Sequence, residues 1–330
     1  MADLHSLLKN RDWLLADGAM GTNLFALGLK QGDAPETWNF SEPDKLLGLH
    51  RAFIDAGADI ILTNSFGGTR NRLKLHAGLE EQCFNINQRA AELARQAVTE
   101  SGKEVVVAGS MGPTGDLYEP IGPLSIAEGA KAYTEQAQGL AAGGADVLWI
   151  ETLSSIEEVS AAVEGAKTTS LPIVVTASFD SKGRTMMGLG PKEFADAMRA
   201  LPLAAFGANC GSGTPDLSVA VGTMAEHGDS EIIVAKSNAG IPEFMGGEFV
   251  YNGTPEHMAN YATLARDLGA RVIGGCCGTT PDHLKAMRNA LETTPKGPKP
   301  SLETISQTLG APSQAGATKA PRRGGRRARG

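Results

Sequence analysis

Short apolar segments alternate with longer amphipathic segments along most of the chain. Each apolar segment is too short for a helix and is hydrophobic on both faces, which is typical of a strand buried in a parallel sheet. Eight such strands are predicted, at residues 13–17, 59–63, 104–109, 146–151, 173–178, 204–209, 231–235 and 271–275.

Helix start signals lie in the segments between these strands. Ser125 followed by Glu128 has the pattern of a capping box, and Gly143-Gly144 marks the end of the same helix. Three other starts place a proline at the first helical position, after Thr214, Thr254 and Thr280. The remaining helices are predicted at residues 41–56 and 80–100, after Ser154-Ser155 and at 191–201.

Eight strand–helix pairs predict an α/β fold, the (β/α)8 TIM barrel, as a single domain over residues 1–294. A doubly wound sheet is the main alternative. It usually carries G-x-G-x-x-G after its first strand, whereas the corresponding turn here, residues 17–22, reads DGAMGT.

Composition and charge narrow the class of protein. Of 330 residues, 42% are apolar and 20% are charged, which excludes global disorder. Residues 295–330 are rich in Pro, Gly and Arg and are expected to form a disordered or loosely packed tail. Eight Lys or Arg against one acid give this tail +7; subtracting this from the net −7 leaves −14 for the rest. An acidic body argues against a nucleic-acid-binding core, although the arginines of the tail leave contact with RNA or a partner as an alternative.

The expected location is the cytoplasm. Four cysteines are too few for a disulfide scaffold, no apolar run reaches the roughly 18–20 residues needed to span a bilayer, and the N-terminus lacks signal-peptide features. Small-molecule substrates and a homo-oligomer are expected.

Polar residues cluster where the predicted strands end, which is the active-site face of a barrel. Three of the four cysteines are among them: Cys210 after the sixth strand, and Cys276 and Cys277 after the eighth. A bend permitted by Gly274, Gly275 and Gly278 would let all three thiolates converge. Three thiolates with no fourth protein ligand are typical of a catalytic zinc site; as an alternative, the cysteines are small core residues.

These motifs resemble the homocysteine S-methyltransferase family. The matching segments are DGAMGT at 17–22, LTNSF at 62–66, IET at 150–152, GANC at 207–210, SNAG at 237–240 and GGCCGTTP at 274–281. They extend over about residues 12–290, and the last segment combined with the separate Asn-Cys is the most specific.

The resemblance implies Zn²⁺ held by Cys210, Cys276 and Cys277, with homocysteine as the fourth ligand through its sulfur. It implies that Asp17 and Glu151 hold the ammonium of homocysteine and that backbone N–H groups near Ala19 and Met20 receive its carboxylate. Ser178 and Asn209 would add hydrogen bonds, and Asn238 would coordinate zinc when substrate is absent. As alternatives, Asp17 caps a helix and Glu151 pairs with a cation.

The region around residues 17–40 is similar to bacterial betaine–homocysteine methyltransferases. This similarity favours glycine betaine as methyl donor, with L-methionine and dimethylglycine as products. Quaternary ammonium groups favour aromatic faces, and Trp38, Phe66 and Tyr118 are the predicted donor pocket. Gly67 stands where those enzymes have a tyrosine, so their aromatic cage is not simply retained.

Other donors and chemistries stay open. S-methylmethionine, dimethylsulfoniopropionate or a separate methylcorrinoid protein would serve the same acceptor, whereas no cobalamin domain is expected within the chain. A different class of barrel enzyme would use a Schiff-base lysine, for which Lys236, near the end of the seventh strand, is the candidate.

Overall fold

The computed structural model describes residues 4–180, 182–227, 231–240, 242–245 and 248–313. Its centre is an eight-stranded parallel sheet in the order β1-β10-β7-β6-β5-β4-β3-β2. Hydrogen bonds between the segments around β1 and β2, including a bridge of Ala16 with Ile60, bring the two edges together into a barrel. The strands are β1 Leu14–Leu15, β2 Ile60–Leu62, β3 Val106–Met111, β4 Val147–Leu153, β5 Ile173–Ala177, β6 Ala205–Cys210, β7 Ile233–Ser237 and β10 Ala270–Gly275.

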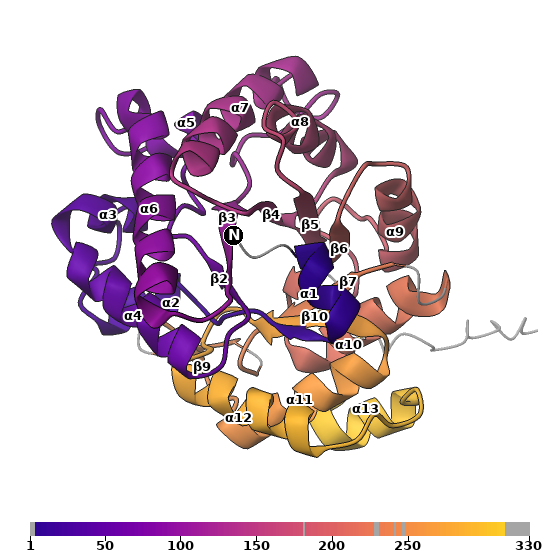
Figure 1. Ribbon diagram of the computed structural model, residues 1–330. Helices are drawn as coiled ribbons and strands as arrows, with labels where there is room; N and C mark the ends of the chain where they lie inside the picture. Colours follow the sequence, from indigo (N-terminus) through magenta and orange to yellow (C-terminus); the bar gives the residue numbers. More distant parts are fainter. Residues whose placement is uncertain (1–3, 181, 228–230, 241, 246–247, 314–330) are drawn as a thin grey trace, which may run out of the picture.

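Helices surround this barrel, as Figure 1 shows. The predicted ones are α4 Pro43–Asp55, α6 Cys83–Ser101, α7 Ile126–Ala142, α8 Ile156–Ala166, α9 Pro191–Arg199, α10 Thr214–Met224, α11 Pro255–Asp267 and α12 Pro281–Thr293. The capping box of Ser125 and Glu128 is formed at the start of α7. The predicted (β/α)8 barrel is therefore confirmed.

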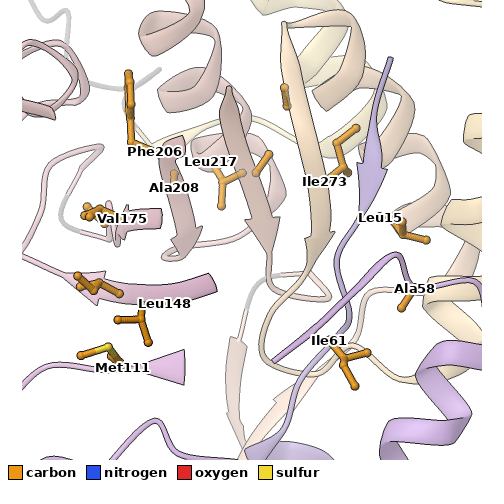
Figure 2. Packing of buried hydrophobic residues seen from close by; sticks show 14 of the residues in the cluster. Leu15, Ala58, Ile61, Met111, Leu148, Val175, Phe206, Ala208, Leu217 and Ile273 are labelled. Carbon is orange, nitrogen blue, oxygen red and sulfur yellow. The ribbon is translucent and has the colours of Figure 1, made fainter. Parts of the chain in front are cut away.

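Strand residues alternate between two hydrophobic clusters. Leu15, Ile61 and Ile273 belong to the cluster between the strands and the surrounding helices, part of which Figure 2 shows. Their neighbours Leu14 and Val272 belong to a second cluster, together with Leu4, Leu7 and Leu8 of helix α1 (Leu4–Asn10). Because successive strand residues face opposite sides, the second cluster fills the barrel interior, and α1 closes one end of it.

Several short elements escaped the sequence analysis. They are α2 Gly21–Ala26, α3 Trp38–Ser41, α5 Arg70–Leu73, the short 3-10 helices at Pro35–Thr37, Glu80–Gln82 and Ala225–His227, and the antiparallel hairpin of β8 Pro242–Met245 with β9 Glu248–Tyr251. Of these, α3 adjoins α4, and the 3-10 helices at Glu80–Gln82 and Ala225–His227 adjoin α6 and α10. The other short elements lie in the loops that follow β1, β2 and β7, which is the face where the functional residues were predicted.

Part of the expected tail is helical and packs against the barrel. Helix α13 (Leu302–Leu309) packs on α10 and α11, and its Ile305 and Leu309 are buried. The side chain of Asp216 accepts hydrogen bonds from Ser313 N–H (3.0 Å) and Oγ (2.7 Å). The expectation of a loose extension is therefore wrong for this part, because an amphipathic turn of helix covers apolar surface there. Residues 314–330, with the arginines, lie outside the described residues.

Buried His50 makes stability depend on pH. Both of its ring nitrogens are buried in α4 with no hydrogen-bond partner among the described residues, and burial lowers its pKa from 6.5 to about 4. His50 therefore binds a proton below pH 6.5 in the unfolded chain but only below about pH 4 in the folded chain. The free energy of unfolding consequently falls as the pH falls through this window. Urea unfolding should show a loss of about 2 kcal/mol between pH 7 and pH 5 from this residue.

The variant His50→Met should lack this part of the pH dependence. His5→Met, at an exposed position on α1, serves as the matched control and should retain it. An unchanged slope in His50→Met would show that the protonation of His50 is not coupled to folding.

Candidate active site and metal centre

Three thiols meet at the carboxyl ends of the strands. Cys210 is the last residue of β6, and Cys276 and Cys277 directly follow β10. Their Sγ atoms all lie within 4.8 Å of one another. Within the described part of the chain, no other three or more His, Cys, Asp or Glu side chains lie close enough together to hold a metal ion.

Backbone geometry turns adjacent cysteines toward the same point. Cys276 N–H donates to Ser237 O (2.6 Å), which holds it to β7, and Gly278 then adopts a left-handed φ of +77°. A Cβ on Gly278 would lie 2.3 Å from Cβ of Tyr251, so only glycine fits there. Cys210 is itself left-handed, with φ of +60°. The predicted bend after β10 is therefore present, and Gly278 is the residue in it that adopts the left-handed conformation.

Two asparagines hold the cysteine segments in place. Asn209 Oδ1 accepts hydrogen bonds from Thr152 N–H (2.9 Å) and Thr176 Oγ1 (2.6 Å), and its Nδ2 lies 3.8 Å from Cys276 Sγ. Asn238 Oδ1 accepts from Cys277 N–H (3.1 Å) and its Nδ2 donates to Gly211 O (2.8 Å). In this conformation both amides position the cysteine loops rather than face a ligand.

The donor set fits a zinc ion. Sulfurs bound at about 2.3 Å to a tetrahedral zinc lie about 3.8 Å apart, which small rotations of these three side chains would achieve. The neighbouring Cys276 thiol lowers the pKa of Cys210, but the Cys277 thiol and burial outweigh this effect and raise the pKa to about 12. Such thiols need a cation to become thiolates at neutral pH.

A cavity of about 500 Å³ opens beside the cysteines. Its walls include several predicted site residues, namely Ala19, Met20, Phe66, Glu151, Cys210, Cys276 and Cys277. The other predicted residues do not line it: Asp17, Trp38, Tyr118, Ser178, Asn209 and Asn238. All six of the latter are buried.

Of the two carboxylates predicted to bind the substrate ammonium, Glu151 lines the cavity. Its Oε1 accepts a hydrogen bond from Ser110 Oγ (2.5 Å), and burial raises its pKa against the opposing effect of the Lys236 charge. Asp17 is instead engaged within the wall: Oδ2 accepts from Leu62 N–H (2.7 Å), and Oδ1 forms an ion pair with Lys236 Nζ (2.9 Å). In this conformation both carboxylate oxygens of Asp17 have protein partners.

Two of the three aromatics predicted for the donor pocket do not line the cavity. Trp38 is buried in α3, and Lys45 Nζ lies 4.5 Å from the centre of its ring. Tyr118 is buried against α7, where a Cβ on Gly129 would lie 2.3 Å from its hydroxyl. Only Phe66 of the three aromatics reaches the cavity, because the loop after β1 turns into helix and packs Trp38 into the core.

The cavity also contains residues that the sequence analysis did not select. Phe25 of α2 is one of them, and Glu36, Arg72 and His76 also line it. Glu36 Oε1 accepts a hydrogen bond from Gly67 N–H (2.6 Å), and burial raises the pKa of this carboxyl. A single Glu within the short 3-10 helix Pro35–Thr37 carries no periodic signal, so its position depends on the tertiary fold.

Lys236 lines the same cavity, with 2% of its side chain exposed. Burial alone would lower its pKa, but the charges of Asp17 and Glu151 outweigh this effect and raise it. A charged amine is not nucleophilic, so the alternative of a Schiff-base enzyme is not favoured.

Comparison with known proteins agrees with this geometry. Residues 14–291 match the model of the family "Homocysteine S-methyltransferase". The chain belongs to the homocysteine S-methyltransferase family. Among solved structures, the homocysteine methyltransferase MmuM from Escherichia coli in its oxidized form has 25% identity and a TM-score of 0.74, over 87% of this chain and 98% of that chain. Its metallated form has a TM-score of 0.73, with 25% identity over 87% and 99% of the two chains.

Curated relatives in the family are much longer proteins. The methionine synthases of Mycobacterium tuberculosis (strain ATCC 25618 / H37Rv) and Mycobacterium leprae (strain TN) are each 30% identical over 305 residues, which are 88% and 86% of this chain. The chain spans about a quarter of their length. Family membership supports an enzyme that transfers a methyl group to homocysteine. The described residues contain no helix with the length and apolar character needed to cross a membrane.

Proposed function

We propose that the protein transfers a methyl group from an onium donor, preferably glycine betaine, to the thiolate of L-homocysteine in a zinc-dependent reaction. L-methionine and dimethylglycine are then the products. The observation that carries this proposal is the trio of Cys210, Cys276 and Cys277 at the wall of a cavity that also exposes Glu151.

Each residue of the site has a defined role in this proposal. Cys210, Cys276 and Cys277 would hold the metal, and Asn209 and Asn238 keep their loops in register. Bound zinc would supply the Lewis acidity that converts the homocysteine thiol into a thiolate at neutral pH and leaves a position open for it. Glu151 receives the substrate ammonium, with Ser110 holding one of its oxygens.

The donor side of the cavity supports a cationic methyl donor. Phe25 and Phe66 are partly exposed there, and Glu36 contributes a carboxylate in the same wall. Aromatic faces and a nearby carboxylate both stabilise an onium group, and each aromatic contact contributes about 0.5–2 kcal/mol. Arg72, in the same wall, offers a partner for the carboxylate of betaine.

A methylcorrinoid carried by a separate protein is the second candidate donor. The observation that favours it is the similarity to methionine synthases, of which this chain matches only a quarter. This candidate shares the metal site and the homocysteine site with the first and differs in the donor alone.

Parallel turnover assays distinguish the two candidates. Zinc-loaded protein and homocysteine are incubated with glycine betaine, S-methylmethionine, dimethylsulfoniopropionate or methylcobalamin, and methionine is measured. We expect the highest kcat/KM with betaine and, in Phe66→Ala, a KM for betaine raised roughly 2- to 30-fold with little change in the KM for homocysteine.

The matched control is Phe40→Ala, which removes an exposed aromatic of α3 that does not line the cavity. It should leave the KM for betaine unchanged. Turnover with methylcobalamin alone would reject the onium donor and favour the second candidate, and no methionine with any donor would reject the proposed function.

A further inference from the structure

Tyr251 lies next to the cysteine centre but outside the cavity. It is the last residue of β9 and is partly buried, and it does not line the cavity, whereas Cys277 does. A Cβ on Gly278 would lie 2.3 Å from Cβ and 2.4 Å from Cγ of Tyr251, so the tyrosine side chain packs directly on the backbone that follows Cys277. Tyr251 therefore reaches the cysteine loop without contacting the space that substrates enter.

Hydrogen bonds hold the end of the β8–β9 hairpin against the cysteine loop. Ala239 N–H donates to Cys277 O (2.9 Å), and Gly253 N–H donates to Ala239 O (2.9 Å). On α12, His283 Nε2 lies at hydrogen-bond distance from Gly253 O (2.7 Å). Because Gly253 follows Tyr251 by two positions, these bonds fix the place at which the tyrosine meets the loop.

The backbone of Cys277 is held in place, so the position of its sulfur depends on the side-chain rotamer. Its N–H donates to Asn238 Oδ1 (3.1 Å) and its carbonyl accepts from Ala239, which leaves rotation about the Cα–Cβ bond. Burial raises the pKa of the Tyr251 hydroxyl, and Cys277 raises it further through its charge and its hydrogen-bonding proximity. The other two cysteines of the centre act on this pKa through charge alone, so Cys277 is the thiol nearest to the hydroxyl.

We propose that Tyr251 is a positioning residue of the metal centre, whose hydroxyl donates a hydrogen bond to the sulfur of Cys277. This inference rests on the proposed function, because it takes the three cysteines as the ligands of zinc. Three thiolates carry more negative charge than one Zn²⁺ neutralises, and a phenol O–H directed at one sulfur stabilises the excess. The same hydrogen bond selects the rotamer of Cys277 that directs its sulfur toward the other two.

Metal binding tests this role without turnover. The variant Tyr251→Phe retains the ring that packs on Gly278 and removes only the hydroxyl. Competition with a chromophoric chelator at neutral pH should show that the Kd of Zn²⁺ rises roughly ten- to hundredfold, the usual effect of losing a hydrogen-bond partner of a metal ligand. Co²⁺ in place of zinc reports on the sulfurs directly. Its sulfur-to-metal charge-transfer band should move to longer wavelength, because a thiolate without its hydrogen bond gives up electron density more readily.

Tyr133→Phe is the matched control, because it also removes a hydrogen-bonded hydroxyl. Tyr133 lies on α7, outside the cysteine cluster, and its hydroxyl donates to Gly112 O (3.1 Å) and lies 3.2 Å from Glu158 Oε1. This variant should leave the Kd of Zn²⁺ and the Co²⁺ band unchanged. A Kd or a band that stays at its wild-type value in folded Tyr251→Phe, or equal changes in both variants, would overturn the role of Tyr251. Wild-type protein that binds no zinc would instead reject the proposed function.

Discussion

Replacing Cys276 with alanine is expected to lower bound zinc from about one ion per chain to below about 0.1 and to reduce methionine formation to the background rate. Cys276 directly precedes Cys277 in the chain, Cys210 ends the strand two places away in the sheet, and all three sulfurs are within 4.8 Å of one another. Its loss leaves two thiolates, which are too few for a stable zinc site, and without zinc the pKa of an incoming thiol is not lowered. Metal analysis by mass spectrometry after dialysis, together with methionine assays, measures both effects.

Cys83→Ala is the matched control, because it removes the other thiol among the described cysteines. Cys83 is buried on α6, where its Sγ donates a hydrogen bond to Gly68 O (3.2 Å), and it is not part of the cysteine cluster. This variant should retain zinc and activity. Full turnover in Cys276→Ala, or loss of zinc in a folded Cys83→Ala protein, would contradict the assigned metal centre.

Glu151→Gln is expected to raise the KM for homocysteine roughly ten- to hundredfold while zinc content stays near one ion per chain. The substitution keeps the shape and the hydrogen bond from Ser110, but it removes the negative charge that faces the substrate ammonium. Glu151 lies outside the cysteine cluster, so metal retention separates this defect from that of Cys276→Ala. Steady-state kinetics with homocysteine as the varied substrate measures it.

Glu158→Gln provides a matched control at a buried glutamate outside the cavity. Its carboxylate accepts hydrogen bonds from Thr114 N–H and Oγ1, both at 2.8 Å, and it lies in α8 behind the barrel wall. We expect a KM for homocysteine close to that of the wild type. A comparable rise of KM in both variants would show that buried charge in general, rather than the substrate contact of Glu151, governs binding.

The sequence predicted those parts of the molecule that depend on local pattern. The eight strands and eight helices of the barrel follow from the period of their apolar residues and from caps such as Ser125. The convergence of the three cysteines was also predicted, because barrel topology sends all strand ends to the same face and Gly278 permits the bend after Cys277.

Long-range contacts decided the rest of the site. Trp38 has the aromatic side chain expected of a donor-pocket residue, but the helix that contains it packs the ring into the core. Asp17 was selected for the substrate ammonium, whereas a lysine 219 positions away in the sequence occupies its Oδ1 atom. Neither contact leaves a signal in the surrounding residues, so only the folded structure reveals them.

X-ray absorption spectroscopy at the zinc edge tests the central claim most directly. Zinc-loaded protein is measured before and after addition of L-homocysteine. We predict three sulfur neighbours at about 2.3 Å without substrate and four with it, because the sulfur of homocysteine fills the open position. A sulfur count that is unchanged by homocysteine, or a first coordination shell dominated by nitrogen or oxygen, would contradict the account.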